Sequence, residues 1–218
     1  HAAARGSVAI VGGINAPFAS LLADSSRRHG IPFLSLASGT SLARSDDFVF
    51  RARPRNGGKE LGLAAKSMGV SSYSVVVSGF AASHVQEFIR DFESQLGVPP
   101  RRTMVFSGNL NKHIEDFERI GKGVDAMLLV LPDWLAAVAM RELRLRLPGL
   151  PVFASNWAVS HRTHLLAGSL GEGVLTVSFT PPEWDSQEHE FLRFIEETYA
   201  SPIPPVILAM GYDTVAML

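Results

Sequence analysis

Short apolar runs alternate along the chain with longer segments in which apolar residues recur every three or four positions. The short runs predict strands buried on both faces of parallel sheets, and the longer segments predict helices that cover those sheets. The predicted strands are residues 8–11, 32–36, 48–53, 73–77, 103–107, 126–131, 152–154 and 174–179. The sequence therefore predicts an α/β fold built from repeated strand–helix–strand units.

The clearest helical patterns lie between these strands, at residues 17–28, 83–96 and 133–147. In the second of them, Val85, Phe88 and Phe92 fall on one apolar stripe, and Gly97 supplies the stop. We expect each of these helices to connect two parallel strands.

Two clusters of proline and glycine follow a strand without an immediate return, at residues 53–58 and 180–184. Such clusters indicate crossings between two lobes. The boundaries predicted are residues 1–54 with 181–218 for the first lobe and 55–180 for the second. The second lobe holds five predicted strands and is a complete doubly wound unit, whereas the first holds three and looks incomplete.

Composition narrows the class of partner. Twenty basic residues against twenty-one acidic ones leave a formal charge of -1, so no long-range field favours nucleic acid or an anionic membrane. There is no cysteine, which excludes disulfides and thiolate chemistry. No run approaches the about 20 apolar residues of a membrane span. The first residues lack the pattern of a signal peptide, so we expect any export signal to lie outside this chain.

Motifs for catalysis are missing. No nucleophile elbow, His-Glu-x-x-His or phosphate-binding loop occurs, and Gly12-Gly13 lacks the remainder of a dinucleotide fingerprint. His161 and His164 are three apart on a predicted helix, but no third zinc ligand has a fitting spacing. We therefore expect no enzyme activity, no cofactor and no metal site.

Several strings of residues carry a family resemblance through their order and spacing. They are the strand and turn at residues 8–13, the strand at 30–35 with the polar loop at 37–41, the strand at 49–51, the stretch from Asp116 to Ala126, the strand at 171–174, and Gly211-Tyr212-Asp213-Thr214-Val215. Together they resemble the type I periplasmic binding proteins of branched-chain amino acid uptake, the leucine/isoleucine/valine-binding family, over nearly the whole chain. The resemblance implies two doubly wound lobes joined by a hinge. Family members have a strand, a helix, a strand and a helix before the point where this chain begins, and they continue past Leu218, so the resemblance implies truncation at both ends.

A ligand site is expected outside the carboxyl ends of the parallel strands. In the first lobe, the loop with Ser38, Gly39 and Thr40 offers hydroxyl and backbone N–H groups that suit a small anion. By resemblance this loop holds the carboxylate and ammonium of the ligand, with Asn15 and Ala16 on the neighbouring loop. The alternative is an ordinary solvated turn.

On the second lobe, the resemblance places Phe80, Asp133, Trp134, Asn156 and Trp157 at the site. The family often has an acid that holds the ammonium where Trp157 stands, which leaves Asp133 as the nearby carboxylate. The two tryptophans offer instead to stack on an aromatic or otherwise flat ligand. The alternative for either ring is that it covers the start of a helix.

The function implied by the resemblance is a periplasmic or extracytoplasmic solute-binding protein of an ABC transporter. It would close on a small-molecule ligand, an amino acid or a small or aromatic carboxylate, and present it to the membrane permease. One alternative is a ligand-sensing domain of a receptor or regulator with the same fold, which could form a homodimer. The others are a nucleotide-dependent α/β enzyme and a shortened chain that binds nothing.

Overall fold

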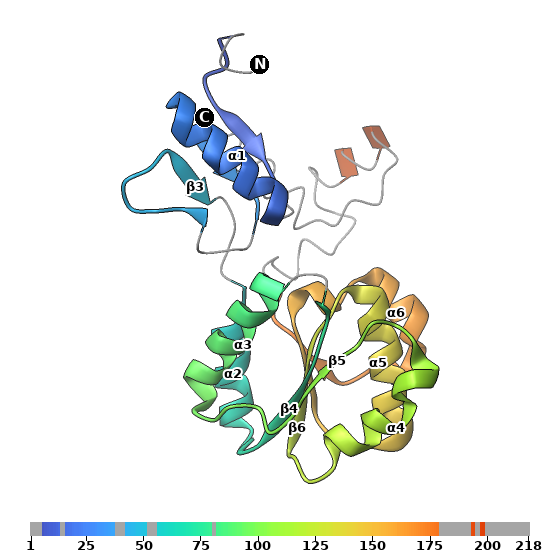
Figure 1. Cartoon of the computed structure of the whole chain (residues 1–218). Coiled ribbons are helices and arrows are strands. Elements are labelled where there is room, and N and C mark those ends of the chain that lie inside the picture. Colours follow the sequence, from blue (N-terminus) through green and yellow to red (C-terminus); the bar gives the residue numbers. More distant parts are fainter. Residues whose placement is uncertain are drawn as a thin grey trace. The chain divides into compact units, whose positions relative to one another are not determined.

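The computed structural model describes residues 6–13, 16–37, 42–51, 56–79, 82–178, 193–194 and 197–198. Contacts within the chain divide it into two compact units (Figure 1). The first unit is His1–Arg55 with Ser178–Leu218, and the second is Asn56–Val177. The chain therefore passes into the second unit once and returns from it once.

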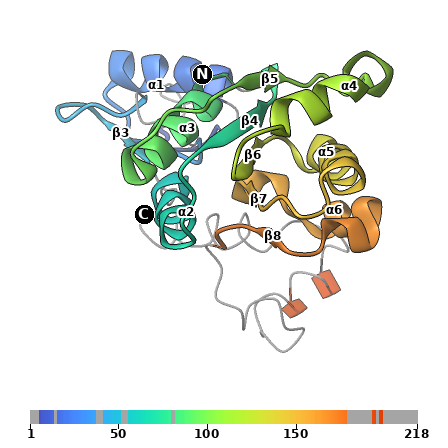
Figure 2. The same ribbon diagram turned by 90° about the horizontal axis from the view of Figure 1, so that it is seen from below.

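The second unit holds one parallel sheet with the strand order β5-β4-β6-β7-β8. Its strands are β4 (Tyr73–Val77), β5 (Thr103–Val105), β6 (Ala126–Val130), β7 (Val152–Ala154) and β8 (Val174–Leu175). Its helices are α2 (Gly58–Ser67), α3 (Ala82–Leu96), α4 (Leu110–Gly121), α5 (Asp133–Arg146), η4 (Asn156–Ala158), α6 (His161–Ala167) and η5 (Gly168–Gly171). Figures 1 and 2 show α2 and α3 on one face of the sheet, with α4, α5 and α6 on the other.

The apolar run of β6 fills two cores at once. Leu128 and Val130 pack with α2 and α3 on one face, and Met127 and Leu129 pack with α4 and α5 on the opposite face. All of these side chains are fully buried. Because successive residues of a strand point to opposite faces, a strand covered on both sides needs a continuous apolar run, which is the pattern seen in the sequence.

Close contact between α2 and α3 depends on Gly58 and Gly62. A Cβ atom built on Gly58 would lie 2.6 Å from the carbonyl oxygen of Phe88, and one built on Gly62 would lie 2.5 Å from that of Phe92. These distances are far below van der Waals contact. Two glycines one helical turn apart therefore let the backbone of α2 lie directly against α3.

The carboxylate of Asp125 joins the starts of β4 and β6. Its Oδ2 atom accepts hydrogen bonds from the backbone N–H of Ser71 at 3.0 Å and of Ser72 at 2.8 Å. The hydroxyls of the same serines donate to it at 2.7 and 3.0 Å. These donors, led by the Ser71 hydroxyl, lower the pKa of Asp125 from 3.8 to about 2 because they stabilise the ionised form.

In the first unit, the described residues include a parallel sheet in the order β1-β2-β3 and the helix α1. The elements are β1 (Ile10–Gly12), α1 (Ala16–His29), β2 (Phe33–Ser35) and β3 (Val49–Arg51). Ala19 and Ala23 of α1 pack against Phe33 and Val49 of the sheet. The small side chains bring the helix close to the strands.

Every strand predicted from the sequence is present, although several are shorter than expected. β1 begins at Ile10 rather than at residue 8, and β3 spans only Val49–Arg51. β5 ends at Val105 because its partner β4 ends at Val77, to which Val105 is paired. β8 ends at Leu175, because it pairs only with Val152 and Phe153 of the short strand β7. The fold class, α/β with parallel sheets, is confirmed.

Candidate functional site

The carboxyl edge of the second sheet contains a point where the connections diverge. The helix after β4, α3, packs on one face of the sheet, and the helix after β6, α5, packs on the other. Strands β4 and β6 are neighbours, paired in parallel along their whole length. In open parallel sheets, the crevice opened by such divergent connections is where ligands bind.

Asp133, the first residue of α5, stands at this edge and is engaged within the protein. Its Oδ2 atom accepts a hydrogen bond from the hydroxyl of Ser160 at 2.9 Å, and its Oδ1 atom accepts one from the backbone N–H of Trp134 at 2.7 Å. An acid in the first turn of a helix is also favoured by the helix dipole. The carboxylate therefore has a structural role whether or not a ligand binds.

Ser160 links Asp133 to the start of α6. Its hydroxyl accepts a hydrogen bond from the backbone N–H of Thr163 at 3.3 Å, and its own backbone N–H donates one to the Thr163 hydroxyl at 3.0 Å. These two hydrogen bonds form a capping box. The Thr163 hydroxyl donates in turn to the carbonyl of Ala158 at 2.9 Å. The starts of α5 and α6 are thus held in one hydrogen-bonded network.

Trp134 lies over the loop that follows β5. A Cβ atom built on Gly108 would come within 3.3 Å of the Trp134 ring and 3.1 Å of Leu135. Gly108 has a φ of 93°, a left-handed conformation that favours glycine. Trp134 as a residue is 39% exposed. It therefore covers this loop while presenting part of its surface to solvent.

Asn156 and Trp157 follow β7 directly, in η4. The Oδ1 atom of Asn156 and the hydroxyl of Ser155 are buried, and no hydrogen-bond partner for either is found within the described residues. Ser155 is 0% exposed. A buried polar atom without a partner costs free energy, about 1–3 kcal/mol, unless water or a ligand supplies the bond.

Trp157 is partly buried and contacts a residue that sequence reasoning missed. Its ring lies edge-to-face with that of His84, with centroids 5.5 Å apart and an angle of 85° between the planes. His84 is in the first turn of α3, only 8% exposed. A signal was present, because His84 is four residues before Phe88 and so shares the apolar stripe of that helix.

The structure describes only some of the predicted site residues. Asp133, Trp134, Asn156 and Trp157 all follow neighbouring strands at the same edge of the second sheet. Ala16 is the first residue of α1, where only its backbone is described. The remaining predicted residues, Asn15, Ser38, Gly39, Thr40 and Phe80, lie outside the described residues.

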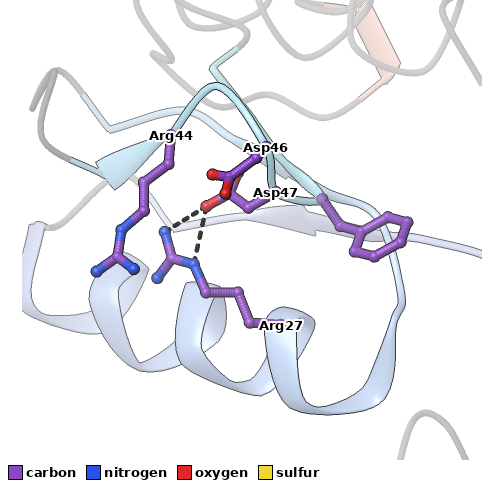
Figure 3. Close-up of a pocket in the computed structure, with 5 residues that line it drawn as sticks. Arg27, Arg44, Asp46 and Asp47 are labelled. Atoms are coloured by element: carbon purple, nitrogen blue, oxygen red, sulfur yellow. Dashed lines mark hydrogen bonds and ion pairs between the residues drawn. The ribbon is translucent and has the colours of Figure 1, made fainter.

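One hollow of about 270 Å³ lies on the first unit (Figure 3), lined by Arg27, Arg44, Asp46, Asp47 and Phe48. It lies at the last turn of α1 and the start of β3, and hence at the amino edge of the sheet. Ligands of parallel sheets bind at the opposite edge. This hollow therefore does not correspond to the predicted site.

Two of the charged residues that line this hollow, Arg27 and Asp47, form an ion pair. The Nε and Nη2 atoms of Arg27 lie 2.8 and 2.6 Å from Oδ2 of Asp47. Burial raises the pKa of Asp47, but the hydrogen bond from the Val49 N–H, followed by that from Arg27, outweighs it, so the pKa is lowered. Arg27 thus fastens the end of α1 to the start of β3.

Within the described part of the chain, no three His, Asp or Glu side chains gather in a way that would hold a metal ion. Among the same residues, no helix is both long enough and apolar enough to cross a membrane.

Two parallel-sheet units, the first of them built from two separate stretches of chain, define the type I periplasmic binding protein fold. No family model and no curated protein matches the sequence. Several solved structures, by contrast, match this chain in fold.

A proposed branched-chain amino acid ABC transporter from Rhodospirillum rubrum is 24% identical, with a TM-score of 0.73, over 96% of this chain and 62% of that one. A leucine-binding protein from Thermotoga maritima is 20% identical, with a TM-score of 0.71, over 99% of this chain and 65% of that one. A solute-binding protein of an ABC transporter from Rhodopseudomonas palustris HaA2, in complex with p-hydroxybenzoic acid, is 16% identical, with a TM-score of 0.76, over 99% and 61%. This chain thus spans between 61% and 65% of the length of these proteins.

Proposed function

We propose that this chain is the ligand-binding part of an extracytoplasmic solute-binding protein of an ABC-type uptake system. It binds a small amino-acid-like or carboxylate ligand rather than catalysing a reaction, and a membrane permease is its partner. The fold supports this, since the solved neighbours include a leucine-binding protein and solute-binding proteins from R. palustris in complex with benzoate or p-hydroxybenzoate.

The observation that carries the proposal is the carboxyl edge of the second sheet. There Trp157 presents part of an aromatic ring, and the amide oxygen of Asn156 lacks a hydrogen-bond partner within the described residues. Both follow a strand beside the point where the connections diverge. An aromatic surface with one or two placed polar atoms is typical of small-molecule sites.

The sequence of the loop with Ser38 and Thr40, in the first unit, offers hydroxyl and N–H donors for a carboxylate, and we propose that this loop also contributes to ligand binding. Charge-assisted hydrogen bonds of this kind contribute roughly 1.5–3 kcal/mol each. Such donors suit the charge of a small acid, whereas the aromatic edge of the second sheet suits its flat or apolar part.

The test is thermal unfolding of the protein with leucine, benzoate and p-hydroxybenzoate in turn. A ligand that binds only the folded state raises the midpoint, by about 2.7 kcal/mol in unfolding free energy at a concentration of 100 Kd. The double variant Ser38→Ala/Thr40→Ala should lose this rise and keep the midpoint of the unliganded protein.

The matched control is Ser67→Ala, which removes an exposed serine hydroxyl in the last turn of α2 and should leave the ligand-induced rise intact. A panel of amino acids and carboxylates that never moves the midpoint would contradict the proposed function. An unchanged rise in the double variant would contradict the assignment of the loop.

A further inference from the structure

The ring pair formed by His84 and Trp157 connects two loops at the carboxyl edge of the second sheet. His84 belongs to the helix entered after β4, and Trp157 follows β7. In the sheet order, β6 lies between these two strands. The contact therefore passes over the end of β6, beside the point where the connections from β4 and β6 diverge.

His84 is anchored on its inner side. Its ring centroid is 6.3 Å from that of Phe88, at an interplanar angle of 55°. Phe88 is 1% exposed and belongs to the core between the sheet and the α2–α3 pair. Phe88, His84 and Trp157 thus form a row of three rings that runs from the core to the partly exposed edge.

The arrangement restricts the orientation of the outer ring. Edge-to-face contact is a preferred geometry of aromatic pairs, and it fixes one ring plane relative to the other. With His84 held by the core, Trp157 cannot turn without breaking its 5.5 Å contact. The indole surface offered at the edge is therefore set by a residue on another element.

The polar groups beside this ring favour one kind of ligand. Both carboxylate oxygens of Asp133 already accept hydrogen bonds within the protein, from Ser160 and Trp134. The Oδ1 atom of Asn156 is a neutral acceptor. This edge thus combines a fixed flat ring with a neutral acceptor, whereas its carboxylate serves a structural network.

We propose that His84 is a positioning residue that fixes the plane of Trp157, and that this pair makes the site select flat, ring-bearing acids over saturated amino acids. The inference rests on the proposed function and specifies its ligand class. A flat ring stacks on an indole face held still, and a ring hydroxyl can donate to Asn156. A saturated side chain gains much less from a fixed plane.

The experiment measures Kd for benzoate, p-hydroxybenzoate and leucine by calorimetry, with near-ultraviolet circular dichroism of the tryptophans. We expect the native protein to bind the benzoates more tightly than leucine. His84→Ala should weaken benzoate binding roughly three- to tenfold, on the order of one aromatic pair, and change the tryptophan dichroism. His84→Phe, which keeps an edge-to-face partner, should restore both.

His84→Leu provides a variant that fills the space without a ring, in case His84→Ala does not fold, and should bind benzoate as weakly. His164→Ala is the control, because it removes an exposed histidine of the same unit and should change nothing.

The outcomes separate the two proposals. A native protein that binds none of the ligands contradicts the proposed function itself. Binding of leucine in preference to the benzoates leaves that function standing and overturns the ligand class. Native benzoate affinity in a folded His84→Ala or His84→Leu variant, with unchanged tryptophan dichroism, overturns the positioning role.

Discussion

Replacing Gly62 by alanine tests the packing on which the second unit depends. A Cβ atom at this position would stand 2.5 Å from the carbonyl oxygen and 3.2 Å from the carbonyl carbon of Phe92, and 3.1 Å from Cβ of Gln95. These are mainly backbone atoms of α3, which cannot turn aside as a flexible side chain can. The two helices must move apart.

The magnitude follows from two opposing effects. Alanine is favoured over glycine inside a helix by about 1 kcal/mol, which would stabilise the variant if nothing obstructed the methyl group. Overpacking a close contact costs about 1–3 kcal/mol, and a contact with backbone belongs at the upper end of that range. We therefore expect Gly62→Ala to lower the free energy of unfolding by roughly 1–2 kcal/mol.

The assay is urea unfolding followed by circular dichroism, analysed for midpoint and slope. Gly149→Ala is the matched control, because a Cβ atom there meets nothing within 4 Å and the backbone is outside the left-handed region. That variant should stay within about 0.5 kcal/mol of the native protein. If Gly62→Ala were as stable as the native protein or more so, the close contact between α2 and α3 would be refuted.

Two further predictions concern polar groups. Asp125→Asn should destabilise the protein near neutral pH. The pKa of Asp125 is lowered from 3.8 to about 2 in the folded state, so the ionised carboxylate stabilises the fold above pH 3.8, and this stabilisation is lost as the pH falls towards 2. Urea unfolding of both proteins across that range should show the gap closing, and a gap independent of pH would contradict the explanation. Ser160→Ala should cost about 0.5–2 kcal/mol, since it removes the cap of α6 and the donor to Asp133. Exposed Ser169→Ala is its control, and equal urea midpoints would show that the cap contributes nothing.

The sequence was most informative where burial alone decides the structure. The bounds of β4 were predicted correctly because Tyr73–Val77, apolar apart from Ser74, is buried at every position. The ends of strands that depend on pairing with a neighbouring strand were not predicted correctly. β8 was expected to extend to residue 179 but ends at Leu175, and only the pairing with β7 shows why.

The sequence predicted where several candidate site residues lie better than it predicted which hydrogen bonds and ring contacts they make. Residues after β6 and β7 could be placed at one edge because parallel strands share it. The hydroxyl that donates to Asp133 belongs to Ser160, the N-cap of a different helix, and no local sequence pattern links the two residues. His84 was missed for the related reason that its contact, Trp157, belongs to an element far along the chain.

The two cores of the second unit meet across a single sheet, and most of their side chains belong to strands and helices. The turns that leave β4 and β7, by contrast, contribute mainly Ser78, Gly79, Asn156 and Trp157 to the carboxyl edge, none of which belongs to either core. Substitutions there alter what the edge presents without removing a member of either core. A lineage could therefore exchange one ligand for another by changing these turns while both cores stay intact, whereas a change at Asp133 would have to be accompanied by a new anchor for α6.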